Sequence, residues 1–324
     1  MRIITLEEHY RSKLSPEFTT PYYDRFNFGA GQLAEKLADI GERRIAEMDS
    51  AGISMQILSH TAPSPEILDG QRALPLCQKI NDELAAAVAA HPTRFGAFAS
   101  LPIGDPVAAA TELERAIVGL EFQGAMIHGC TQGRFLDDAF FYPILEKAEA
   151  LEVPIYLHPA PPPEPVFDVY FAGLDKTIAT MLATAGWGWH AELGLHTLRL
   201  IAAGIFDRFP KLQIIIGHMG EMIPFQLARV DRGFSRFSDL KRKASEYFQS
   251  NLHITTSGLF TAPPLNLALQ TLGADRILFS IDYPYSSLET GKTYLDQLFL
   301  PAADLEKIAH RNAERLFKFN SATA

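Results

Sequence analysis

The sequence is poor in cysteine: only Cys77 and Cys130 occur among 324 residues. Two distant cysteines form no C-x-x-C motif and cannot build a disulfide framework. Such scarcity is typical of proteins from a reducing compartment, so we expect a cytoplasmic location. The acidic residues Glu7 and Glu8 also come too early in the chain for the apolar core of a signal peptide.

Runs of basic residues and long apolar runs are also missing. The net charge is −9, with 29 lysines and arginines against 38 acidic residues, so we expect no nucleic-acid partner. No stretch approaches the roughly 18 apolar residues of a membrane helix, so we expect no membrane association. With 47% hydrophobic residues and no break in composition, the sequence predicts one globular domain over residues 1–324.

Short apolar runs recur along the chain, and most follow a helical pattern. Most lack strict alternation of polar and apolar residues, which predicts parallel strands buried on both faces. Eight such strands joined by helical segments predict a single (β/α)8 barrel. The expected strands are 2–6, 55–59, 94–102, 124–129, 153–159, 212–220, 252–258 and 276–284, and a helix over 304–317 closes the chain.

The two longest irregular stretches, 10–33 and 159–176, each follow a predicted strand. The second is rich in proline, which fixes φ and disfavours regular pairing. Because long loops after the strands of a barrel build its binding site, we expect both to border a ligand.

Ionisable residues follow four of the predicted strands. Glu7 and His9 follow the first strand, and their i, i+2 spacing places them on one face of an extended chain. His158, His218 and Asp282 end the fifth, sixth and eighth strands. Because these ends meet at one mouth of a barrel, the side chains are expected to converge. Two histidines and two carboxylates suit Zn²⁺ or Mn²⁺, with a further position open for water or substrate.

Each residue alone also has an ordinary structural explanation. A single histidine is more often a hydrogen-bonded structural residue than a ligand, and Asp282 could form a turn or cap a helix. Glu8 could pack or form a salt bridge on the opposite face of the strand. The coincidence of ligand-type residues at four strand ends favours the metal site.

Four motifs resemble the amidohydrolase superfamily, in its amidohydrolase 2 branch: LEEH (6–9), YLHP (156–159), IIGHMGE (215–221) and FSIDYP (279–284). More narrowly, they resemble metal-dependent non-oxidative decarboxylases of γ-resorcylate, 2,3-dihydroxybenzoate and 5-carboxyvanillate. The resemblance covers nearly the whole chain, including 188–221 and 310–317. Glu7, where many amidohydrolases have histidine, is similar to the benzoate decarboxylase subgroup.

The resemblance implies an amidohydrolase-type barrel with one divalent ion, Mn²⁺ or Zn²⁺, with Mg²⁺ as a further option. It implies Glu7, His9, His158 and Asp282 as the metal ligands. Asp282 is also the expected proton donor. His218 is the second candidate for the acid, or it positions the substrate's phenolate or a metal-bound water.

Two residues after the sixth strand have both a functional and a structural interpretation. Glu221 would fix the tautomer of His218, or would be an acid favoured in the first turn of a helix. Arg229 resembles the arginine that faces the substrate carboxylate in the family, and its alternative is a salt bridge to Asp231 or another helix neighbour.

The pocket wall is predicted from position. Tyr23, His190 and Tyr285 are expected to contact a planar substrate. The expected substrate is a small aromatic carboxylic acid, and the resemblance implies a homodimer or homotetramer.

The sequence thus predicts a metal-dependent non-oxidative decarboxylase of a hydroxylated aromatic acid, which protonates the ring carbon before CO₂ leaves. One alternative is a metal-dependent hydrolase of a lactone, ester or amide that uses a metal-activated water. Another is a metal-binding scaffold without catalysis.

Overall fold

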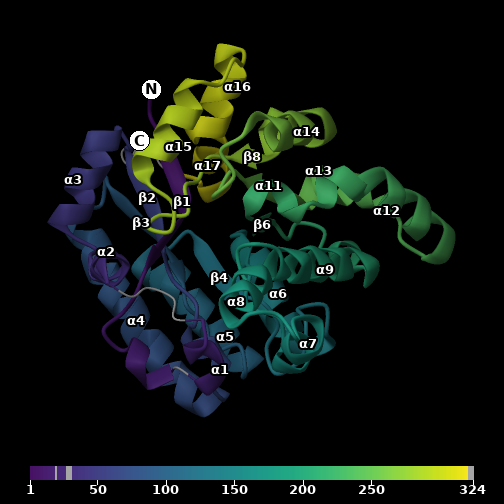
Figure 1. The fold of residues 1–324 in the computed structure, drawn as a ribbon, viewed down its shortest axis with the longest axis horizontal. Coiled ribbons are helices and arrows are strands. Elements are labelled where there is room, and N and C mark those ends of the chain that lie inside the picture. The colour runs from purple at the N-terminus through teal and green to yellow at the C-terminus, as the bar shows by residue number, and fades with distance from the viewer. Residues whose placement is uncertain (19, 27–30, 320–324) are drawn as a thin grey trace.

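The computed structural model describes residues 1–18, 20–26 and 31–319, and its centre is a barrel of eight parallel strands (Figure 1). The strands are β1 (Ile4–Tyr10), β2 (Met55–His60), β3 (Phe95–Ala99), β4 (Gly124–His128), β5 (Ile155–His158), β6 (Ile214–Ile216), β7 (Leu252–Thr255) and β8 (Ile277–Leu278). Each pairs in parallel with the next in sequence order. The ring closes just beyond β8, where the His9 N–H donates to the Tyr283 carbonyl at 2.7 Å. The predicted barrel is confirmed.

Helices connect the strands and surround them (Figure 1). They are α1 (Pro21–Asp24), α2 (Gln32–Ala38), α3 (Glu42–Ala51), α4 (Gly70–Ala90), α5 (Pro106–Glu114), α6 (Tyr142–Leu151), α7 (Glu164–Tyr170), α8 (Lys176–Ala183), α9 (Gly188–Ala202), α10 (Ile205–Arg208), α11 (His218–Glu221), α12 (Ile223–Phe237), α13 (Ala244–Asn251), α14 (Ala262–Leu272), α15 (Leu288–Asp296), α16 (Ala302–Glu306) and α17 (Asn312–Phe317). Among the described residues, none of these helices has both the length and the apolar content needed to span a bilayer.

The apolar core has two parts, because every residue of the eight strands is buried. Alternate strand residues such as Ile4, Met55, Phe98 and Ile215 pack together inside the barrel. The remaining apolar strand residues pack outward against the helices in a larger cluster. Burial on both faces explains why the strand sequences read as apolar runs rather than as alternating patterns.

The first strand is longer than predicted and contains a bulge. It continues to Tyr10, so Glu7 and His9 lie within the strand rather than after it. Its register on β2 passes from Thr5 opposite Gln56 to Glu8 opposite Leu58, so three steps along β1 match two along β2. An extra residue reverses the faces of all that follow. The bulge thereby turns the metal-ligand pair toward the barrel axis, on the same side as Ile4.

Two further predictions of local structure need correction. The proline-rich stretch 159–176 is not wholly irregular, because α7 forms within it. Its first turn contains Pro165, and proline is well suited there since the first N–H groups of a helix have no internal partner. The closing helix predicted over 304–317 is interrupted by a wider π-helical turn at Lys307–Arg311 between α16 and α17.

A buried histidine, His196, makes the stability of the fold depend on pH. His196 of α9 is almost fully buried, and its Nε2 accepts the Leu136 N–H at 2.8 Å. Burial, with Arg199 nearby, lowers the pKa of His196 from 6.5 to about 3. Since the unfolded chain takes up a proton that the folded chain refuses, this contribution to stability is complete above pH 6.5 and is lost as the pH falls toward 3.

We therefore expect the free energy of unfolding to fall with pH below 6.5 and His196→Gln to remove part of that dependence. At pH 4.5 the part due to His196 is about 2–3 kcal/mol. Urea denaturation of both proteins at pH 7 and pH 4.5 measures it. Equal pH dependence in the two proteins would contradict the assignment.

Candidate metal centre and active site

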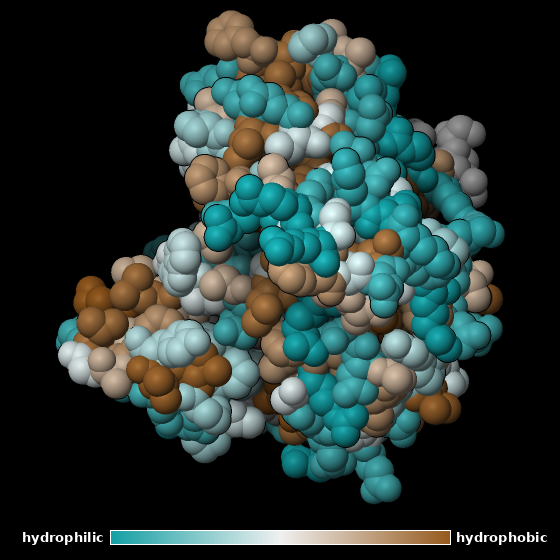
Figure 2. Space-filling view, turned by 90° about the vertical axis from the view of Figure 1, so that its right-hand side faces the viewer, coloured by the Kyte–Doolittle hydropathy of each residue, from teal (hydrophilic) through white to brown (hydrophobic). Residues whose placement is uncertain are grey.

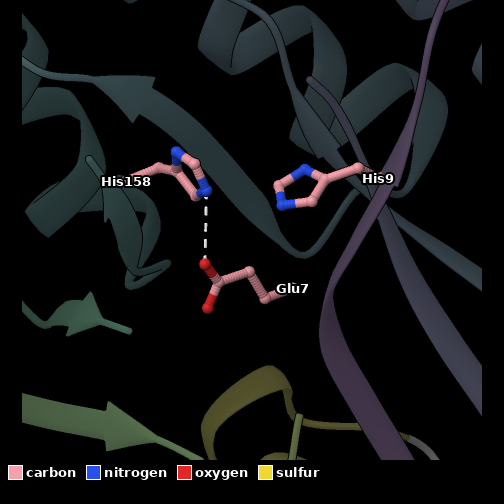
Figure 3. A group of neighbouring side chains, drawn as sticks. All are labelled: Glu7, His9 and His158. Atoms are coloured by element: carbon pink, nitrogen blue, oxygen red, sulfur yellow. Dashed lines mark ion pairs between the residues drawn. The ribbon is translucent and has the colours of Figure 1, made fainter. Parts of the chain in front are cut away.

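Three side chains from two strands converge at one mouth of the barrel (Figure 3). Glu7 and His9 come from β1, and His158 is the last residue of β5. One ligand atom from each lies within 4.8 Å of the others, and Glu7 Oε1 is 3.2 Å from His158 Nε2. The predicted i, i+2 pair thus faces the predicted histidine across the barrel.

Asp282 and His218 join this group from the other side. Asp282, which follows β8, places Oδ1 at 3.3 Å from His9 Nε2. His218, which follows β6, places Nε2 at 3.7 Å from Glu7 Oε1 and 4.0 Å from Asp282 Oδ2. The structure therefore brings together all five ionisable residues that the strand ends were predicted to present.

Neighbouring groups orient the ligand atoms. His158 Nδ1–H donates to the Pro159 carbonyl at 2.7 Å, which leaves Nε2 as a free lone pair toward Glu7. Glu7 Oε2 accepts hydrogen bonds from the Tyr156 hydroxyl and, at 3.2 Å, from Thr255 Oγ1. Its other oxygen, Oε1, is thereby directed at the centre of the group.

The residues fit a divalent cation. Glu7 Oε1 and His9 Nε2 are buried, and neither has a hydrogen-bond partner within the described part of the chain. Leaving such atoms unpaired away from water is costly, and a bound cation removes that cost. Nitrogen and carboxylate oxygen donors together suit Mn²⁺ or Zn²⁺. Glu7, His9, His158 and Asp282 are the residues that could hold it.

The charges of the group depend on one another. Burial alone would raise the pKa of Glu7, but His218 and the other histidines hold it well below its usual value. Burial and the Glu7 carboxylate raise the pKa of Asp282 to about 7. A bound divalent cation would oppose the second shift. Two carboxyl groups in one site thus have distinct proton affinities, a common arrangement for acid–base chemistry.

Glu221 links two histidines. Its Oε1 accepts from His218 Nδ1–H at 2.7 Å, and its Oε2 accepts from His190 Nδ1–H at 2.8 Å. Although burial opposes it, the Glu221 and Glu7 carboxylates raise the pKa of His218 to about 10. His218 therefore presents Nε2 to the metal-ligand group, and Glu221 holds the ring in that orientation.

The backbone after β6 adopts a strained conformation that places His218 and Glu221 in this arrangement. Residues 218–222 all have positive φ: His218 50°, Met219 56°, Gly220 83°, Glu221 53° and Met222 63°. Left-handed backbone costs roughly 1–2 kcal/mol for each residue that is not glycine. This turn replaces the predicted continuation of the strand to residue 220, and it brings Glu221 beside the His218 ring.

A cavity of about 180 Å³ opens beside the group. Besides His158, His218 and Asp282, it is lined by Thr61, Ala62, Thr184, Ala185, Trp189 and Tyr285. Tyr285, a predicted contact, lies in this wall, and its hydroxyl is 2.6 Å from Thr61 Oγ1. Among the described residues that line the cavity there is no lysine or arginine, so a bound cation and His218 are the positive charges that could face a carboxylate.

Three other predicted substrate contacts do not line this cavity. His190 lies behind Glu221, Tyr23 is half-buried on α1, and Arg229 is exposed on α12. The structure therefore does not bring Arg229 to the cavity of its own chain. Arg229 and Asp231 do not form the alternative salt bridge either. The Asp231 carboxylate instead accepts hydrogen bonds from Ser245 at 2.6 Å and 2.8 Å.

The two long loops meet, as expected for segments that border one site. The Tyr22 hydroxyl donates to the Pro162 carbonyl, and Arg25 pairs with Glu164 at 2.7 Å. Phe167 of α7 packs edge-on against Tyr22. Residues 19 and 27–30 of the first loop lie outside the described residues.

Three residues that hydrogen-bond to the Glu7 carboxylate or leave space for it were not predicted from the sequence. Tyr156 could have been found, because it precedes His158 by two residues and so shares its face of the strand. Thr255 ends β7, a strand from which no site residue was predicted. Gly217 carries no chemical signal, yet a Cβ there would lie 2.8 Å from Glu7 Oε2.

Comparison with known proteins gives consistent relationships. The family model described as amidohydrolase matches residues 22–319. The decarboxylase orsB of Emericella nidulans is 38% identical, over 98% of this chain and 97% of its own. A γ-resorcylate decarboxylase of Polaromonas sp. is 37% identical, over 98% of each chain.

A solved structure extends the likeness to the fold. A dihydroxybenzoic acid decarboxylase from Polaromonas sp. JS666, with bound manganese and the inhibitor 2-nitroresorcinol, is 35% identical. The likeness has a TM-score of 0.88 and covers 99% of this chain and 98% of that one.

Gly217 provides a test of the ligand geometry. Replacing it by alanine should displace the Glu7 carboxylate and weaken Mn²⁺ binding by about tenfold or more. Gly233→Ala on α12 is the matched control, because nothing lies within 4 Å of the added carbon. It should bind Mn²⁺ like the wild type. Titration followed by the electron paramagnetic resonance signal of free Mn²⁺ measures both, and an unchanged affinity in Gly217→Ala would contradict this geometry.

Proposed function

The chain belongs to the amidohydrolase family, and we propose that it is a metal-dependent, non-oxidative decarboxylase of a small hydroxylated aromatic acid. The observation that carries the proposal is the convergence of Glu7, His9, His158 and Asp282 beside a cavity whose described lining includes no lysine or arginine. The relatives named as decarboxylases, which match nearly end to end, support the reaction class.

We propose one Mn²⁺ as the cofactor, because the Polaromonas decarboxylase carries manganese. Zn²⁺ and Mg²⁺ are the alternatives for the same ligands. When bound, the ion supplies positive charge that holds the substrate carboxylate and an adjacent hydroxyl oxygen and stabilises negative charge. Glu7, His9 and His158 would hold the ion, since their ligand atoms point toward one another (Figure 3).

Asp282 is the proposed proton donor. Direct loss of CO₂ would leave an aryl carbanion, so the ring carbon must first be protonated. Asp282 gives its proton to the carbon that bears the carboxylate. The carbon–carbon bond then breaks, its electrons restore the aromatic ring, and CO₂ leaves. Burial and the Glu7 carboxylate favour the protonated form of Asp282, which is the form a proton donor needs, and a bound cation would oppose them.

His218 and Glu221 prepare the next cycle. After one turnover Asp282 lacks a proton, and His218 Nε2 lies 4.0 Å from Asp282 Oδ2. At that distance His218, held by Glu221, would return a proton that solvent supplies through one bridging water. It is also the second candidate for the donor to the ring, and the two assignments are separated below.

The cavity suits a planar ring. Its volume of about 180 Å³ is that of a small ligand, and Trp189 and Tyr285 provide aromatic wall. The paired hydroxyls of Thr61 and Tyr285 form the polar part of the wall beyond the ligand group. This arrangement supports an acid with further ring hydroxyls.

The test uses metal-depleted protein reloaded with Mn²⁺ or Zn²⁺. We expect 2,6-dihydroxybenzoate, 2,3-dihydroxybenzoate or 5-carboxyvanillate to lose CO₂, which ultraviolet spectra and CO₂ capture would record. In D₂O the product should carry one deuterium at the former carboxylate position. Asp282→Asn should lower kcat by about 100-fold or more, whereas His218→Gln should retain more of the rate.

The same assay can contradict the proposal. Hydrolysis of a lactone or ester without CO₂ release from any acid would favour the hydrolase alternative, in which a metal-activated water attacks. Greater loss in His218→Gln than in Asp282→Asn, at equal metal content, would transfer the donor role to His218.

We also propose that the chain forms a homodimer or homotetramer. Several large apolar side chains are exposed, among them Tyr170 of α7, Ile178 of α8, and Phe225 and Phe237 of α12. On the face seen in Figure 2, hydrophobic residues gather on a lobe that projects to one side of the molecule. Exposed apolar clusters of this kind commonly mark interfaces. Light scattering should give two or four times the chain mass of 35.9 kDa, and a monomer mass would overturn the proposal.

A further inference from the structure

Glu8 lies beside the metal ligands in sequence but on the opposite face of β1. Its side chain is completely buried and is surrounded by hydrogen-bond donors. Oε1 accepts from the Ile281 N–H at 2.9 Å and from Ser280 Oγ at 3.2 Å. Oε2 accepts from the Tyr283 N–H and from Gln56 Nε2, both at 3.3 Å. Both oxygens are therefore used by groups from the segment after β8 and from β2.

The two backbone donors flank Asp282. One precedes it and the other follows it, so a single carboxylate holds the peptide on both sides of the proposed ligand and proton donor. Asp282 itself has a φ of 70°, a left-handed conformation that residues other than glycine rarely adopt. Such a conformation persists only where the surroundings impose it. The bonds to Glu8 provide that constraint.

Arg44 supports the arrangement from the same side. It is fully buried, and its Nη2 donates to the His9 carbonyl at 2.6 Å. Its guanidinium lies 4.7 Å from the centre of the Tyr283 ring. Arg44 thus contacts the backbone of one proposed ligand and the residue after another, and its charge favours the buried Glu8 carboxylate.

We propose that Glu8 is a positioning residue that places Asp282 for metal binding and proton transfer. The inference rests on the function proposed above for Asp282. It gives the two adjacent glutamates different tasks: Glu7 binds the metal ion directly, and Glu8 fixes the segment that carries the fourth ligand. Glu8 does not touch the substrate or the ion.

The variant Glu8→Gln tests the proposal, because it keeps the volume of the side chain but has one acceptor oxygen instead of two. Its amide N–H₂ must then face donors, so the peptide on one side of Asp282 is released. We expect a folded protein whose Mn²⁺ affinity falls by about tenfold or more. We also expect kcat to fall more than KM changes, because the proton donor is displaced.

Glu112→Gln is the matched control. Glu112 of α5 is also buried, and it also accepts from an amide, Asn81 Nδ2 at 2.7 Å, and from an arginine, Arg115 at 2.8 Å. It contacts no proposed site residue. Glu112→Gln should lower the melting temperature and leave Mn²⁺ affinity and turnover unchanged.

The outcomes separate a positioning role from a structural one. Wild-type Mn²⁺ affinity and kcat in Glu8→Gln, or a loss of stability alone as in Glu112→Gln, would overturn the proposal. If Glu8→Gln does not fold, Gln56→Met removes one donor to Glu8 and should weaken Mn²⁺ binding in the same direction; unchanged binding there would overturn it. Because Mn²⁺ affinity is measured without substrate, failure of the decarboxylase assay would not affect this result.

Discussion

The rest of the site depends on two adjacent carboxylates of β1. Both are fully buried, and they lie on opposite faces of the strand. A buried charge must be compensated, and Glu7 and Glu8 are compensated by different means. Glu7 faces the barrel axis, where histidines and a cation balance it. Glu8 faces outward, where burial raises its pKa to about 8 and backbone N–H groups and Arg44 oppose that rise. The β1 bulge makes this division possible, because it assigns the faces of every residue after Thr5.

Few further residues are needed to complete the proposed active site. The inner carboxylate defines the metal-ligand group, and the outer one fixes the segment after β8 that brings Asp282 to it. The left-handed turn after β6 brings His218 and Glu221 to the same place. Strain is thus stored in the backbone at Asp282 and at residues 218–222, beside the reacting groups, while the eight strands are fully buried and, apart from the β1 bulge, regular in their pairing.

The barrel and the ligand-type residues could be predicted from the sequence, because parallel strands are apolar runs and their ends meet at one mouth. The bulge in β1 could not, since it is a property of the register between two strands and leaves no mark in composition. Simple alternation would place Glu7 on the face opposite to Leu6. The contacts of Glu221 with two histidines also depend on a turn that no local pattern predicts. Tyr285 lines the cavity and Tyr23 does not, and their positions in the sequence gave no means to tell them apart.

The most direct test of the metal-ligand assignment is an anomalous diffraction measurement on crystals grown with Mn²⁺ and 2-nitroresorcinol, the inhibitor bound in the Polaromonas structure. We expect one manganese peak per chain, at bonding distance from Glu7, His9, His158 and Asp282, with the aromatic ring in the cavity beside Trp189 and Tyr285. A manganese peak held by other residues, or no peak under saturating Mn²⁺, would contradict the ligand assignment and the mechanism built on it.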